Sequence, residues 1–86
     1  MNYTVRLASS AERDLKRLAG DVLRRIDAKL QSLAGDPRPR GAVKLQGAEG
    51  EGWRVRVGNY RILYTIDDRG RVVLVYRIRP RPTAYR

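Results

Sequence analysis

Short segments in which apolar and polar residues alternate occur at the start of the chain and again through its second half. Alternation with a period of two is typical of β-strands that bury one face. It predicts strands over residues 3–7, 52–57, 60–67 and 71–78. A further short strand or extended segment is expected around Val43 to Leu45, followed by a glycine-rich loop.

Between the first two alternating segments, the apolar residues change to helical spacing. A first helix is indicated by one apolar stripe, formed by Ala11, Leu15 and Leu18. Ser9 and Glu12 fit a capping box at its start, and Gly20 is a plausible stop at its end.

A second helix follows directly. Its apolar residues recur at one-turn intervals, at Val22, Ile26, Leu30 and Leu33. Asp21 is its candidate N-cap, and Pro37 and Pro39 cannot continue it. Two helices in succession predict a helical hairpin.

Two turns join the last three strands. Gly58 and Asn59 suit a tight primed turn, and residues 67–70 suit a second turn with Gly70 in a left-handed conformation. The chain is therefore predicted to be a single α+β domain over residues 1–86. It consists of a strand, a two-helix hairpin and a three-strand antiparallel meander, with both helices on one sheet face and the other face open.

Positive charge dominates this domain. Nineteen lysines and arginines face nine acidic residues, which gives a formal net charge of +10. Arg54 and Arg56 share one strand face, opposite an apolar set of Trp53, Val55 and Val57, and Arg61 lies on the neighbouring strand. Like charges placed side by side destabilise a sheet, so this pattern favours a phosphate site over a merely solvated face.

The last strand continues the basic pattern with Arg77, Arg79 and Arg81, although Pro80 and Pro82 are expected to break its ladder. Arginine suits phosphate because its planar guanidinium can bind two oxygens at once. A polyanion is the predicted partner, and the charge alone fits RNA, DNA, an acidic protein or an anionic membrane, with binding that weakens in salt.

Several classes of chemistry are excluded by composition. The chain has neither cysteine nor histidine, which removes thiol nucleophiles, disulfides, imidazole catalysis and most zinc sites. The acidic residues have helix-cap, helix-surface or turn explanations, so no metal site and no cofactor is predicted. The short apolar runs and the absence of a secretion signal predict a cytoplasmic protein without a membrane span.

The tyrosines divide into two groups. Tyr60 and Tyr64 alternate with strand residues of the core, and they and Trp53 are predicted to pack there. Tyr85 lies beyond the strands, four residues after Arg81, where it either packs at the C-terminus or approaches the arginines.

The order of these elements resembles the RelE/ParE superfamily of bacterial type II toxins over essentially the whole chain. The resemblance rests on the opening Tyr3–Val5, the helical segment 11–18, the Lys44–Gly47 segment, the long run 53–68 and the closing segment 81–86. In the RelE branch, the resemblance implies a ribosome-dependent endoribonuclease that cuts mRNA in the A site without a metal ion.

The resemblance also implies site residues. Arg61, Arg81 and Tyr85 correspond to catalytic positions, with Arg79 in place of Arg81 if the register shifts. The residues expected to bind RNA phosphate are Arg54, Arg56, Arg79 and Lys44. The arginines would stabilise charge as the 2′-hydroxyl attacks the adjacent phosphate, and Tyr85 could serve as the base. Pro80 stands where many relatives have a histidine.

Partners follow from the same resemblance: a cognate RelB-like antitoxin, the ribosome and mRNA, with promoter DNA reached only through the antitoxin complex. Two alternatives stay open at this point. A ParE-like toxin would poison DNA gyrase on the same fold, and a noncatalytic module would use the basic face only to bind RNA or the ribosome.

Overall fold

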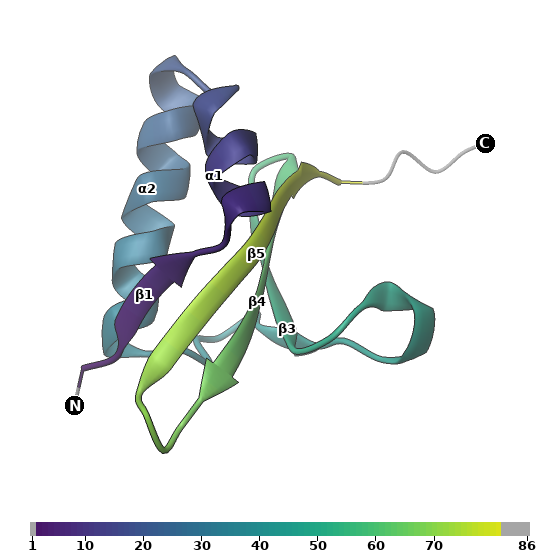
Figure 1. Cartoon of the computed structure of the whole chain (residues 1–86). Coiled ribbons are helices and arrows are strands. Elements are labelled where there is room, and N and C mark those ends of the chain that lie inside the picture. Colours follow the sequence, from purple (N-terminus) through teal and green to yellow (C-terminus); the bar gives the residue numbers. More distant parts are fainter. Residues whose placement is uncertain (1, 82–86) are drawn as a thin grey trace.

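A computed structural model describes residues 2–81 of the chain (Figure 1). Two helices and five strands follow one another in the order β1, α1, α2, β2, β3, β4, β5, with a 3₁₀ turn, η1, after β2. Their bounds are Thr4–Leu7 (β1), Ser9–Lys16 (α1), Gly20–Gly35 (α2), Val43–Lys44 (β2), Gly47–Glu49 (η1), Trp53–Val57 (β3), Tyr60–Asp67 (β4) and Val72–Pro80 (β5). Neither described helix is long and apolar enough to cross a membrane.

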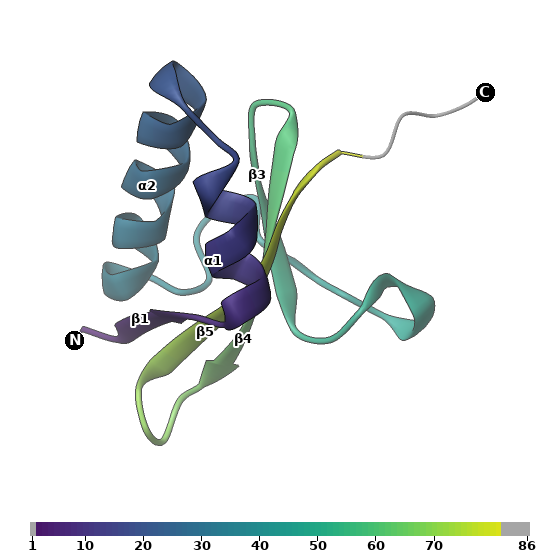
Figure 2. The ribbon, with the colours of Figure 1, turned by 45° about the horizontal axis from the view of Figure 1, so that its top comes forward.

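All five strands form one mixed sheet in the order β1-β5-β4-β3-β2. β1 runs parallel to β5, and the other neighbours are antiparallel, so the predicted β3-β4-β5 meander is confirmed. Both helices lie on the same side of the sheet, as predicted (Figures 1 and 2). The α+β class is therefore confirmed.

The core lies between the helices and one face of the sheet. The second helix contributes Ile26, Leu30 and Leu33, and the strands contribute a set of fully or nearly buried residues, Val55, Ile62, Tyr64, Val73, Val75 and Ile78. Burial of such side chains supplies the main favourable free energy of folding. Trp53 and Tyr60 are partly buried against this core, and Tyr64 is completely buried, as the alternation predicted.

The helix starts differ from their predicted caps. Ala8, not Ser9, is the N-cap of α1, and no side chain caps it; Ser10 instead donates its hydroxyl to the carbonyl of Tyr76 at 2.6 Å. Ala19 is the N-cap of α2. Asp21 lies inside the first turn, where it pairs with Arg24 at 2.6 Å. Tertiary packing on β5 therefore replaces the expected local cap at α1.

Of the two predicted turns, one is confirmed and the other is wrong in its left-handed residue. Gly58 has a φ of +57°, as the predicted primed turn requires. Gly70 is not left-handed; its amide donates to the Asp67 carboxylate at 3.0 Å, and the positive φ of +57° falls on Arg71 instead. As a result β5 begins at Val72, one residue later than predicted.

Part of the second sheet face is covered, contrary to the expectation that it stays open. Leu45 and Leu63 are each only 6% exposed, although both lie outside the main core. The Tyr76 hydroxyl donates to the carbonyl of Glu51 at 2.7 Å and accepts from its amide at 3.2 Å. The segment between β2 and β3 is thereby fixed against this face.

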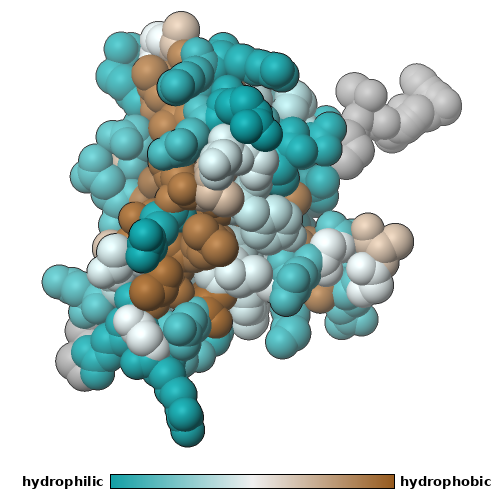
Figure 3. All heavy atoms as spheres, viewed as in Figure 1, coloured by the Kyte–Doolittle hydropathy of each residue, from teal (hydrophilic) through white to brown (hydrophobic). Residues whose placement is uncertain are grey.

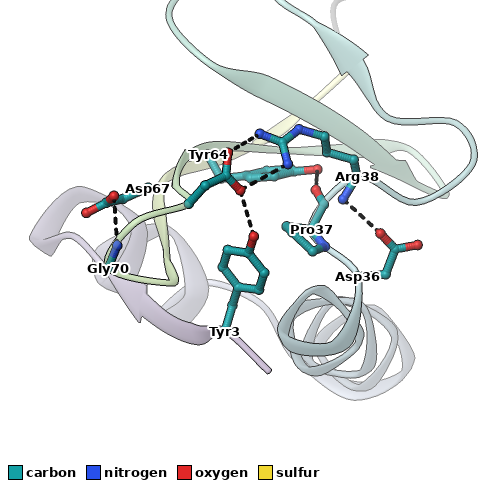
Figure 4. Close-up of polar contacts among 8 residues, drawn as sticks. Tyr3, Asp36, Pro37, Arg38, Tyr64, Asp67 and Gly70 are labelled. Atoms are coloured by element: carbon teal, nitrogen blue, oxygen red, sulfur yellow. Dashed lines mark hydrogen bonds and ion pairs between the residues drawn. The ribbon is translucent and has the colours of Figure 1, made fainter. Parts of the chain in front are cut away.

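A second group of polar contacts joins three distant segments (Figure 4). Arg38 donates to both carboxylate oxygens of Asp68, at 3.2 and 2.8 Å, and the Tyr3 hydroxyl donates to the same carboxylate at 2.6 Å. The buried Tyr64 hydroxyl donates to the carbonyl of Pro37 at 2.7 Å. The start of the chain, the α2–β2 loop and the β4–β5 turn are thus held together.

Asp14 connects the first helix to the last strand. Its carboxylate accepts from Arg77 at 2.9 and 3.3 Å and from the amide of Ile78 at 2.9 Å, and its side chain is 10% exposed. Burial alone would raise the pKa of Asp14, but the bonds from Arg77 and Ile78 outweigh it and lower the pKa. Asp14 is therefore a tertiary contact, and its predicted role as a helix-surface charge is wrong.

We expect Asp14→Ala to lower the free energy of unfolding by about 1–3 kcal/mol, because it leaves a partly buried guanidinium and a backbone amide without an acceptor. Asp14→Asn keeps one acceptor oxygen and should cost less. The exposed Asp21→Ala is the control and should change stability by less than about 0.5 kcal/mol. Urea denaturation measures all three, and equal effects of the two alanine variants would contradict the assignment.

The Asp68 contacts predict a pH dependence of stability. Hydrogen bonds from Arg38 and Tyr3 lower the pKa of Asp68 to about 2, below its usual value, so this carboxylate stabilises the fold above pH about 4 and the contribution is lost as pH falls toward 2. Asp68→Asn should therefore lower Tm near neutral pH and approach the parent Tm near about pH 2. Thermal unfolding across this range, with the exposed Asp27→Asn as control, measures it. A Tm difference that does not change with pH would contradict it.

Candidate phosphate-binding site

Four arginines meet on the sheet face turned away from the helices. The register places Arg56 directly opposite Arg61 on β4, and Arg61 opposite Arg79 on β5. Arg54 precedes Arg56 by two residues and shares its face. The predicted common face of Arg54, Arg56 and Arg61 is therefore confirmed. Together with Arg81, described next, these residues are called the arginine face.

Arg81 joins the set through its backbone. Its amide donates to the carbonyl of Asn59 at 2.7 Å, so the ladder with the β3–β4 turn continues past Pro80. Pro80 is the last residue of β5 and lies opposite Tyr60. On the other side of β5, β1 pairs only as far as Val75, so no strand there requires a hydrogen bond from an amide at position 80. The predicted break of the ladder at Pro80 is thus wrong, while Pro82 and Tyr85 lie outside the described residues.

The charges of these arginines act on one another. Burial lowers the pKa of Arg54 most, and the positive charges of Arg56, Arg61 and Arg81 lower it further; Glu49 offsets part of this effect. Arg56, Arg61 and Arg81 therefore lie close enough to Arg54 to repel it. Such repulsion costs stability unless an anion neutralises it.

The arginine face holds unused donors. Among residues 2–81, the ion pairs are Arg24–Asp21, Arg38–Asp68 and Arg77–Asp14, and none of them includes an arginine of this face. The Nε of Arg61 is buried and has no hydrogen-bond partner. A buried unsatisfied donor costs about 1–3 kcal/mol, and an anion seated beside Arg61 would remove that cost.

Lys44 lies elsewhere. It is paired with Trp53 in the β2–β3 register, on the face opposite Arg54, and its Nζ lies 5.9 Å from the Trp53 ring centroid. Arg38 lies 5.3 Å from the same ring. The structure therefore separates Lys44 from the arginine face, and Trp53 contacts two cations that alternation alone could not reveal.

The chemistry available at this face is charge stabilisation. In the described part of the chain, no three carboxylates gather as metal ligands would. Arg77, predicted to continue the basic pattern, is engaged by Asp14 instead. What remains is a set of guanidinium groups on neighbouring strands, suited to bind the oxygens of a phosphodiester.

Comparison with known proteins identifies the family to which the chain belongs. Residues 5–85 match the family described as the ParE toxin of the type II toxin-antitoxin system, parDE. The chain is therefore a member of the RelE/ParE superfamily of type II toxins. It is 33% identical over 87 residues to the toxin RelG of Mycobacterium tuberculosis, covering 100% of this chain and 99% of that protein.

Two solved structures share the fold at full length. The toxin–antitoxin complex RelBE2 of M. tuberculosis contains a chain with 32% identity and a TM-score of 0.82, covering 94% of this chain and 100% of that one. The archaeal RelE–RelB complex of Pyrococcus horikoshii contains one with 27% identity and a TM-score of 0.84, covering 98% and 100%.

Repulsion on the arginine face predicts that removing one charge stabilises the free protein. Arg56→Gln should raise the free energy of unfolding by about 0.2–1 kcal/mol at low salt, since it removes the like charge opposite Arg61. The gain should shrink at about 1 M salt, where screening is strong. Arg69→Gln, in the exposed β4–β5 turn, is the control. A loss of stability in Arg56→Gln at every salt concentration would contradict the prediction.

Proposed function

We propose that this toxin is a ribosome-dependent endoribonuclease that cleaves mRNA in the A site. The observation that carries the proposal is the buried, partnerless Nε of Arg61 within a face of five arginines that no carboxylate neutralises by an ion pair in the described chain. Such a face is suited to a phosphate whose charge increases during reaction.

In the proposed reaction, the 2′-oxygen of the RNA attacks the adjacent phosphorus while the bond to the 5′-oxygen breaks. The products are a 2′,3′-cyclic phosphate and a 5′-hydroxyl. Tyr85 takes the proton of the 2′-hydroxyl, and water protonates the leaving 5′-oxygen. Arg61 and Arg81 stabilise the charge on the phosphoryl oxygens, so the proposal needs no metal ion.

Tyr85 would act as a base only if nearby guanidinium groups lowered its pKa from the usual value of about 10. Arg81, four residues earlier in the sequence, lies close enough to Arg54 for their charges to interact, and we propose that this positive charge acts on Tyr85. Because Pro80 stands where many relatives have histidine, imidazole takes no part. Positioning of the RNA must then supply much of the rate, which is why we assign that task to the ribosome.

We further propose a RelB-like antitoxin as the regulatory partner. Two related chains were solved in complexes with such antitoxins. This chain has an apolar hollow of about 340 Å³ between β1 and α2, lined by Val5, Leu7, Leu30 and Ala34, in the region where Figure 3 shows an apolar stripe among charged side chains. An amphipathic antitoxin segment would cover this stripe and offset the excess positive charge.

A ParE-like gyrase poison is the second candidate, because the matching family is described as the ParE toxin. The arginine face favours RNA cleavage instead. Two assays separate these candidates: toeprinting of a translated message and DNA supercoiling by gyrase. New breaks at the A site support the ribonuclease, whereas inhibited supercoiling with intact RNA supports the gyrase poison.

The cleavage proposal predicts separate effects on rate and binding. Arg61→Ala or Arg81→Ala should reduce single-turnover cleavage on programmed ribosomes by about 10²-fold or more, the scale of losing one contact to a developing oxyanion. Ribosome binding should change far less. Tyr85→Phe removes only the hydroxyl and keeps the ring, so it should reduce the cleavage rate strongly if the hydroxyl is the base.

Arg69→Ala, which removes the same charge from an exposed turn, is the matched control and should cleave like the parent. Arg54→Ala and Arg56→Ala are expected to weaken binding as well as rate, because they would hold the RNA backbone. If cleavage survives both Arg61→Ala and Tyr85→Phe, the assignment is wrong and the arginine face is an affinity surface of a noncatalytic module.

A further inference from the structure

A second cationic hollow lies beside the arginine face, at the β2 edge of the sheet. It has a volume of about 320 Å³. Its charged lining consists of Lys29, Arg40, Arg54 and Arg56, with Gly41 and Val43 between them. The four cations come from α2, the α2–β2 loop and β3, so this hollow is assembled by the tertiary fold and could not be found as a sequence motif.

The short length of β2 creates the hollow. Val43 of β2 pairs with Arg54, and the strand begins there, so no strand residue lies opposite Arg56. In the β3–β4 hairpin, Val57 and Tyr60 close the two-residue turn as a hydrogen-bonded pair. The backbone of Arg56 therefore faces away from β4, toward the open edge. A ligand in the hollow would meet a backbone edge as well as cationic side chains.

Arg40 is presented to this edge by an ordered turn. The amide of Ala42 donates to the carbonyl of Pro39 at 2.9 Å, and Gly41 has a φ of +94°, as the third position of a type II turn requires. The loop before the turn is fixed by the hydrogen bond between Tyr64 and Pro37 and by the contact of Arg38 with Asp68 (Figure 4). These bonds limit the freedom of the loop that carries Arg40.

The charge of the hollow is only partly compensated, because the carboxylate of Glu49 acts on Arg54. Within residues 2–81, none of its four cations takes part in an ion pair, and no carboxylate lines it. Lys29 is half-buried on α2 and lines the hollow together with three arginines, of which Arg56 repels Arg54. An anion placed among these groups would relieve the repulsion, as it would on the arginine face.

We propose that this hollow binds a second phosphate group of an RNA backbone, with Lys29 and Arg40 as its new ligands. Arg54 and Arg56 border both sites, so one strand could pass from the arginine face around the edge of β3. The inference rests on the proposed function only for the identity of the polyanion as RNA. The phosphate could come from mRNA or from ribosomal RNA, and the chemistry of binding is the same.

The test is the salt dependence of binding to two probes, a single-stranded oligoribonucleotide and empty ribosomes. Removing two phosphate contacts in Lys29→Gln/Arg40→Gln should reduce the slope of log K against log salt by about 1.4 with the oligoribonucleotide, at about 0.7 per contact with a single strand. Arg13→Gln/Arg69→Gln removes the same charge from exposed positions and is the matched control. Lys29→Arg keeps the charge and should bind like the parent.

A reduced slope with the oligoribonucleotide assigns the hollow to mRNA, and a reduced slope with empty ribosomes alone assigns it to ribosomal RNA. Slopes equal to those of the control variant with both probes would overturn the inference. Equal slopes with both probes are also the result expected if the hollow binds a protein and no RNA. Because the readout is binding, it is independent of cleavage: a parent protein that never cuts RNA would refute the proposed function and leave this test intact.

Discussion

Repulsion among like charges on one sheet face is the constraint on which the rest of this structure depends. Strand alternation sends Val55 and Ile62 into the core and, by the same geometry, places Arg56 and Arg61 opposite each other on the other face. Neither residue can turn inward without reversing the burial of its strand. The free protein must therefore tolerate a high density of positive charge on this face.

Among residues 2–81, the ion pairs of the acidic residues lie outside the arginine face. Asp14 engages Arg77 and joins α1 to β5, and Asp68 engages Arg38 and joins the loops at the other end of the sheet. Both carboxylates form their ion pairs with arginines outside the arginine face, although the charge of Asp14 also acts on Arg79. Within the described chain, the carboxylates that hold the scaffold together thus form no ion pair with the arginine face, and under the proposed function its donors bind a phosphate.

Much of the architecture could be predicted because it depends on local periodicity. Alternation located the β3–β4 hairpin, the buried Tyr64 and the shared face of Arg54, Arg56 and Arg61. The errors arose where contacts distant in sequence override local preference. No side chain caps α1, where Ser9 is the predicted cap, and the neighbouring Ser10 bonds to Tyr76. Lys44 falls on the face opposite Arg54 because only the β2–β3 register fixes its parity. That Lys29 and Arg40 line the same hollow could not be predicted from the sequence either, since it requires the tertiary fold.

The central claim is that the Nε–H of Arg61 is held free for an RNA phosphate. Its most direct test is heteronuclear NMR of the arginine Nε–Hε resonances during titration with a single-stranded oligoribonucleotide. The account predicts a saturable downfield shift of the Arg61 resonance as it gains an acceptor, with no comparable change at Arg69 in the exposed turn. An Arg61 resonance that does not move, or moves no more than that of Arg69, would contradict it.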